Sequence, residues 1–191
     1  DSCNVADYAM AAVEIAPLSA AQSSALSTSI NAHGPTTNTP TGPALQGAVN
    51  HAKAWGIAHP THKVAVVFAT DGDPTECDPQ DIPSIANIAM AALNGNPSVP
   101  TFVIGVGPSL SSLNAIAAGG GTGSAFLVDT GGNVVQQFQA ALAAIQDSAL
   151  GCEYTIPQPA QGMLDYGKVN VQYTPGNGGM PQVIGNVANA A

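Results

Sequence analysis

One short stretch constrains the fold more than any other part of the chain. An uninterrupted apolar run, Val64 to Ala69, ends abruptly in the polar sequence TDGDP at 70–74. A run rich in β-branched residues and bounded by polar ones predicts a strand buried on both faces, as in a parallel sheet. Asp71 would then lie at the carboxyl end of a strand, where α/β proteins bind ligands. The alternative is structural, because Asp-Gly is also a common turn sequence.

Strand and helix patterns alternate along the chain as far as Gly151, after an irregular start at 1–8. Apolar runs predict strands at 11–16, 64–69, 101–106 and 125–128. Helical spacing, with Ser19 and Asp81 as N-caps, predicts helices at 20–30, 43–55, 83–93, 111–117 and 134–150. This alternation indicates an α/β fold with a parallel sheet and crossover helices. The tail changes to β segments at 152–156, 169–173 and 182–187, with a turn at 174–179.

The charge of the chain excludes some classes of partner. Only 8% of the residues are charged, with three lysines, no arginine and a formal net charge of −9. Nucleic-acid binding is not expected, since little here can neutralise phosphates. No apolar run is long enough to span a bilayer. An acidic surface suits a divalent cation, and a surface of small neutral residues is typical of secreted proteins.

The motifs of several enzyme and metal-site classes are missing. The sequence contains no GxxxxGK[ST], no GxSxG and no HExxH. His59 and His62 flank a proline and are expected to be loop residues rather than a zinc site. The cysteines, Cys3, Cys77 and Cys152, form no CxxC pair, and their odd number leaves one without an internal partner. No nucleophile–base pair can be named, so an enzyme is the least supported class.

A threonine and an aspartate form the best candidate site. Thr39 belongs to a hydroxyl-rich loop that precedes a helix, and Asp71 follows the central strand. If that helix packs beside that strand, both side chains reach one rim of the sheet. Hydroxyl and carboxylate oxygens are ligands for a hard cation. The neighbouring acidic residues, Asp73, Glu76, Asp78 and Asp81, are expected to form a solvated loop and a helix cap.

A family resemblance rests on four segments. They are TPTGPAL at 39–45, VVFATDGDPTEC at 66–77, TFVIGVG at 101–107 and LNAIAAGGGT at 113–122. Together they resemble a von Willebrand factor A domain of the bacterial secreted or surface type. The resemblance covers residues 1–152 and leaves 153–191 as a β-rich extension. It implies a doubly wound, mostly parallel sheet with helices on both faces.

The same resemblance implies a metal-ion-dependent adhesion site. The family usually binds Mg²⁺ there, sometimes Mn²⁺ or Ca²⁺, and the carboxylate of the ligand often completes the coordination. Thr39 and Asp71 match the family's threonine and aspartate ligands, and Asp73 would contribute from outside the direct ligand set. The family's DxSxS motif does not occur in this sequence. The resemblance therefore implies a fragment, or a second segment or chain that supplies the missing strands and ligands.

Two further expectations follow from that alignment with the family. Residues 11–16 would form an antiparallel edge strand, which begins at the metal-bearing rim. Cys3 and Cys77 would then both lie toward this rim and could form a disulfide, whereas a Cys77–Cys152 link would contradict that pairing. Cys152 would then be the odd cysteine, either a free thiol or paired with a cysteine outside this chain, for example in the absent segment.

The resemblance implies a function of binding rather than catalysis. We expect an extracellular, cell-surface or periplasmic adhesion domain that uses a divalent cation to engage a carboxylate-bearing protein or peptide. The alternative is a metal-free structural or interaction module on the same fold. In that case Thr39 belongs only to a helix-entry loop and Asp71 only to a turn.

Overall fold

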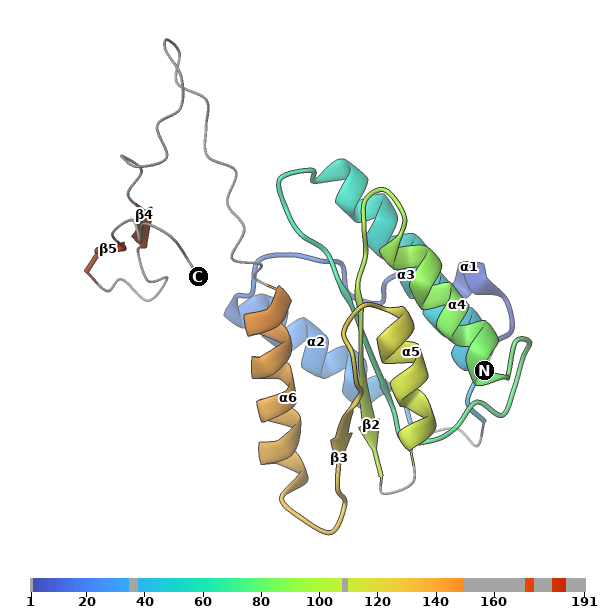
Figure 1. Cartoon of the computed structure of the whole chain (residues 1–191). Helices are drawn as coiled ribbons and strands as arrows, with labels where there is room; N and C mark the ends of the chain where they lie inside the picture. Colours follow the sequence, from blue (N-terminus) through green and yellow to red (C-terminus); the bar gives the residue numbers. More distant parts are fainter. Residues whose placement is uncertain (1, 35–37, 108–109, 150–170, 174–179, 185–191) are drawn as a thin grey trace, which may run out of the picture. The chain divides into compact units, whose positions relative to one another are not determined.

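The computed structural model describes residues 2–34, 38–107, 110–149, 171–173 and 180–184 (Figure 1). The chain separates into two compact units, Asp1–Gly151 and Cys152–Ala191. The helices of the first unit are α1 (Val5–Tyr8), α2 (Ala20–Ala32), α3 (Thr41–Ala58), α4 (Ile82–Leu93), the 3₁₀ turn η1 (Ser111–Leu113), α5 (Asn114–Gly119) and α6 (Val134–Ala149). Its strands are β1 (Val66–Thr70), β2 (Thr101–Val106) and β3 (Phe126–Val128).

The three strands form one parallel sheet in the order β1-β2-β3. Phe68 pairs with Val103 in the first ladder, and Ile104 pairs with Phe126 in the second. The helices between the strands are the crossovers that a parallel sheet requires. The expectation of an α/β fold with a parallel sheet is therefore confirmed, with β1 and β3 as the edges of a three-stranded sheet.

Helices cover both faces of the central strand β2. Val103 belongs to a core with residues of α3, α4 and α5, whereas Phe102 and Ile104 belong to a second core with residues of α6. Figure 1 shows α6 on one side of the sheet and α3, α4 and α5 on the other. Because side chains alternate along a strand, one short strand contributes to both cores.

The prediction that β1 is buried on both faces is wrong. Val66 is buried and Phe68 packs against the core formed with α3 and α4. On the other face Val67 is 44% exposed and Ala69 is also exposed. The reason is the position of β1 at the edge of the sheet, since α6 packs against β2 and β3.

The predicted edge strand at 11–16 is also wrong, because this segment is irregular. Its backbone bonds with side chains instead of a neighbouring strand. The carbonyl of Glu14 accepts a hydrogen bond from Nε2 of Gln22 at 2.7 Å, and just before the segment Nδ1 of His51 lies 3.2 Å from the carbonyl oxygen of Ala9. Before it, residues 5–8 form helix α1 with Asn4 as N-cap, where the sequence predicted irregular structure.

Both predicted helix caps are confirmed. Ser19 accepts a hydrogen bond from the backbone N–H of Gln22 at 3.2 Å, and Asp81 accepts one from that of Ser84 at 2.8 Å. The bond from Ser84 holds the pKa of Asp81 below its ordinary value of 3.8. Helix α3 begins two residues before the predicted Pro43.

The described part of the second unit is a small antiparallel pair. β4 (Val171–Tyr173) pairs with β5 (Gln182–Ile184), with Gln172 opposite Val183. Both strands overlap predicted β segments, while the β segment expected at 152–156 and the turn at 174–179 lie outside the described residues. Among all the described helices, none is long and apolar enough to cross a membrane.

Candidate functional site

Two loops that are far apart in the sequence are bonded to each other at the carboxyl end of β1. The backbone N–H of Thr39 donates to Oγ1 of Thr75 at 2.9 Å. The backbone N–H of Thr75 donates in return to the carbonyl of Thr39 at 3.2 Å. This reciprocal pair fixes the position of the loop before α3 relative to the loop after β1.

The docking places the Thr39 side chain over the turn that contains Asp71. Its Oγ1 lies 3.4 Å from the position that a Cβ atom on Gly72 would occupy. The turn itself is closed by Thr70, whose Oγ1 donates to the Gly72 carbonyl at 2.9 Å and accepts from the Gly72 N–H at 3.2 Å. The structure therefore brings the half-buried Thr39 to the turn that carries the exposed Asp71.

Asp73 links this turn to the next loop along the sheet. Its Oδ1 accepts a hydrogen bond from Oγ of Ser112 at 2.8 Å. Ser112 belongs to η1, which follows β2, so the bond joins the loops at the carboxyl ends of two neighbouring strands. The contribution of Asp73 to a cation site stays a prediction, and its observed role is this link.

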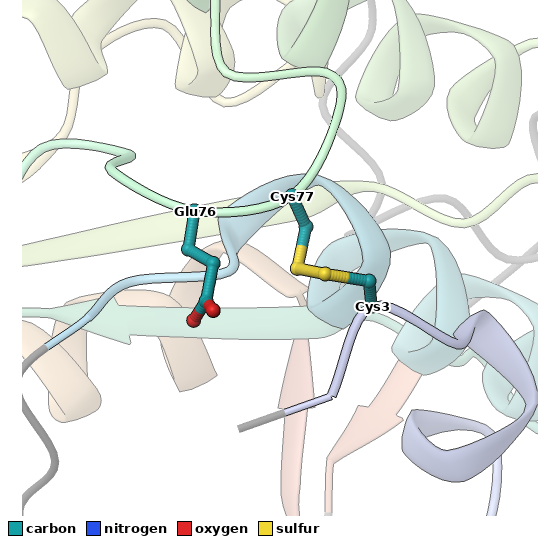
Figure 2. Close-up of side chains that lie close together, drawn as sticks. All are labelled: Cys3, Glu76 and Cys77. Carbon is teal, nitrogen blue, oxygen red and sulfur yellow. A yellow bond between two sulfur atoms is a disulfide. The ribbon is translucent and has the colours of Figure 1, made fainter.

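A disulfide joins Cys3 to Cys77, with their Cα atoms 5.3 Å apart (Figure 2). The predicted pairing is confirmed, but the route to it differs, because Cys3 precedes a short helix and not an edge strand. Helix α1 packs against α3 at Gly47, where an added Cβ would collide with Tyr8. The absence of a side chain at Gly47 thus lets α1 lie close enough for Cys3 to reach the loop after β1.

Glu76 is less solvated than the sequence suggested. The residue is half-buried, and its Oε2 is buried without a hydrogen-bond partner among the described residues. Figure 2 shows its carboxylate beside the Cys3–Cys77 disulfide. Potential ligand atoms of these three residues lie within 4.8 Å of one another. A disulfide has no thiolate left to bind a metal, so this cluster is not a cysteine metal site.

The start of α3 packs beneath the same loop. A Cβ on Gly42 would lie 2.6 Å from the carbonyl oxygen of Pro79, so only glycine fits this contact. Thr41 is 2% exposed, and its Oγ1 has no hydrogen-bond partner in the part of the chain that the structure describes.

Sequence reasoning found some of these residues and missed others. It named Thr39, Asp71 and the two paired cysteines, all of which the structure places at or near the carboxyl end of β1. It missed Thr75, Ser112 and the burial of Glu76. A threonine or serine that bonds across two loops has no local sequence pattern, and only the neighbouring Cys77 hints that Glu76 lies in a packed loop.

No family model, curated protein or solved structure matches this chain. The relation to the von Willebrand factor A family therefore stays a prediction from the quoted segments.

Proposed function

We propose that the chain is an extracytoplasmic binding domain of von Willebrand A type that engages its partner through a divalent cation. Thr39 and Asp71 would hold Mg²⁺, or Mn²⁺ or Ca²⁺ in its place. A protein or peptide partner would supply a carboxylate to the same ion. The observation that supports this proposal is the position of the Thr39 hydroxyl over the Asp71–Gly72 turn.

The chemistry of the two side chains suits such an ion. Mg²⁺ prefers oxygen ligands, usually keeps several waters and is often bound through only one or two carboxylates. A threonine hydroxyl and an aspartate carboxylate therefore form part of a coordination sphere, which leaves positions for water and for the carboxylate of a ligand. Among the described residues only β2 pairs with β1, so the other edge of β1 is where a further segment or chain could add strands and ligands.

The disulfide supports the proposed location. Disulfides persist in secreted, surface and periplasmic proteins and are rare in reducing compartments. The Cys3–Cys77 bond also closes a large loop around the candidate site, since the two residues are 74 positions apart.

A thermal-shift titration tests the cation proposal. The whole chain would be melted in Mg²⁺ or Mn²⁺ and in chelator, together with Thr39→Ala and Asp71→Ala. Thr130→Ala and Asp147→Ala are matched controls at exposed positions. A cation that binds only the folded state raises Tm by mass action, so the rise should be lost in the first two variants and kept in the controls. No rise in the parent chain, or an equal rise in all variants, contradicts the proposal.

A second candidate function is a metal-free interaction module on the same fold. It is favoured by one observation, namely that the two loops are already joined through the backbone of Thr39 and the side chain of Thr75. On this view Thr39→Ala and Asp71→Ala change the free energy of unfolding to the same extent with and without cation. The titration above therefore separates the two candidates.

A further inference from the structure

The C-terminal end of α3 carries two histidines on one tight turn. The backbone N–H of His59 donates to the carbonyl of Trp55 at 3.0 Å, which ends the helix. The N–H of His62 then donates to the carbonyl of His59 at 2.9 Å. Pro60 occupies the second position of this turn, where its fixed φ angle is favourable. Both imidazoles are therefore carried by a short, hydrogen-bonded piece of backbone.

One of the two rings is fixed in the form that binds metals. Nδ1 of His59 lies 2.8 Å from the carbonyl oxygen of Trp55. A carbonyl can only accept, so in the neutral ring Nδ1 carries the proton and Nε2 keeps its lone pair. A histidine whose other nitrogen donates to a backbone carbonyl is the usual arrangement of a metal ligand. Nδ1 of His62 lies 3.3 Å from the hydroxyl of Thr61, which can donate or accept.

The spacing of the rings is at the upper limit for one shared ion. The centroids of His59 and His62 lie 6.0 Å apart, with the ring planes at 86°. A metal bound to an imidazole nitrogen at about 2.1 Å lies roughly 3 Å from the ring centre, so two ligating rings have centres up to about 6 Å apart. The observed separation therefore places the rings on nearly opposite sides of a shared ion, and a tetrahedral angle at the ion needs rotation of the exposed His62 ring.

Trp55 restricts the motion of the first ring. Its indole stacks on His59 with centroids 4.1 Å apart and meets His62 edge-on at 5.5 Å. The three rings line a cleft of about 530 Å³ together with residues 15–17 of the irregular N-terminal segment. The His59 ring is therefore held between an aromatic neighbour and a backbone hydrogen bond.

The charges near the two rings include one favourable and one opposing contribution. His59 is the C-cap of an 18-residue helix, and the C-terminus of a helix carries partial negative charge. The chain as a whole has a formal net charge of −9. Lys63 follows His62 directly and opposes cation binding, but its side chain is exposed to solvent.

We propose that His59 and His62 form a second metal site, specific for the ions that prefer imidazole. These ions are Cu²⁺, Ni²⁺ and Zn²⁺, whereas Mg²⁺ and Ca²⁺ prefer oxygen ligands. Two protein ligands leave coordination positions open for water or for a side chain of a partner. This proposal does not depend on the cation site at Thr39 and Asp71, because it uses other residues and other ions.

Trp55 supplies the readout, because it is the single tryptophan of the chain. The whole chain, with free thiols alkylated beforehand, would be titrated with Ni²⁺ and with Cu²⁺ while its fluorescence is followed. We expect saturable quenching with one ion per chain and no response to Mg²⁺. His59→Ala and His62→Ala should each weaken half-saturation by roughly tenfold or more. Because His59→Ala removes the ring that stacks on Trp55, it can change the fluorescence of the variant itself. The stoichiometry of that variant is therefore measured by calorimetry.

His33 offers a matched control. It ends α2, and its Nδ1 lies 2.7 Å from the carbonyl oxygen of Ser29, four residues earlier, as in His59. His33→Ala should leave the titration unchanged. Quenching that does not saturate, that survives His59→Ala and His62→Ala, or that falls equally in His33→Ala overturns the proposal.

Discussion

The neighbouring strands β1 and β2 come from similar apolar sequences but have different surroundings. The residues of β2 from Thr101 to Gly105 are all buried, with helices against both faces. In β1 only Val66 is buried, and Val67 is 44% exposed on the face away from α3 and α4. The difference lies in their positions, since β2 is central and β1 is an edge.

The comparison shows how the candidate site is held in place. The loop after β2 follows a strand that is packed on both faces. The loop after β1 follows an edge strand and is instead held by cross-links, namely the Cys3–Cys77 disulfide, the Thr39–Thr75 hydrogen bonds and the Asp73–Ser112 hydrogen bond. If this is correct, removing a cross-link should affect the site more than removing exposed apolar surface from β1.

The largest effect is expected from the disulfide. Cys3→Ser and Cys77→Ser should each lower the free energy of unfolding by about 4 kcal/mol, because the bond closes a long loop in the unfolded chain. Urea unfolding would measure this loss, and the double variant should match either single one. A loss below about 1 kcal/mol would show that the loop after β1 does not depend on this cross-link.

The next largest effect is expected when the same change, valine to alanine, is made in each of the two strands. Val103→Ala in β2 removes fully buried methyl groups and should cost about 2–3 kcal/mol. Val67→Ala in β1 should cost less than about 1 kcal/mol, since this side chain is largely exposed. Equal losses in urea unfolding would mean that the outer face of β1 is covered in solution, and the contrast between the strands would be lost.

A smaller effect is expected at the loop contact. Thr75→Val removes the hydroxyl that accepts from the Thr39 N–H, and should cost about 1 kcal/mol. Thr130→Val is the control, because Thr130 is exposed. Amide hydrogen exchange at Thr39 should rise in the first variant only. Unchanged protection of the Thr39 amide from exchange would show that its hydrogen bond to Thr75 does not hold the two loops together.

The smallest effect concerns the helix that follows the site loop. Because the folded state lowers the pKa of Asp81, its carboxylate stabilises the fold above the ordinary pKa of 3.8, and this stabilisation is lost as pH falls through the lower folded value. Asp81→Asn does not titrate. The Tm advantage of the parent chain over this variant should therefore shrink between about pH 5 and pH 2. An advantage that stays constant with pH would contradict this.

The parts of the fold that follow from local chemistry were predictable from the sequence. The bounds of β2 and the caps Ser19 and Asp81 depend on residues close together in the chain. The edge position of β1 was not predictable, because it depends on which strands are present beside it. Residues 11–16 alternate like a strand, yet a strand needs a partner, and here the Gln22 side chain of α2 bonds to the Glu14 carbonyl instead.

The candidate site was predictable only in part. Thr39 and Asp71 could be named because each stands next to a recognisable element, a helix start and a strand end. Their approach depends on Thr75, whose hydrogen bonds span 36 positions of sequence. His59 and His62 could be named from the sequence as well. The hydrogen bond that fixes the His59 ring and the stacking of Trp55, however, are properties of the folded chain alone.

Binding of one divalent cation by Thr39 and Asp71, as proposed above, can be measured by a titration with Mn²⁺ followed by electron paramagnetic resonance. Bound Mn²⁺ loses the sharp spectrum of the free ion, so the bound fraction can be counted. The account predicts about one bound ion per chain. That ion should be lost in Thr39→Ala and Asp71→Ala and retained in Thr130→Ala, Asp147→Ala and His59→Ala. Absence of bound Mn²⁺ in the parent chain, or equal binding in all variants, would contradict the account.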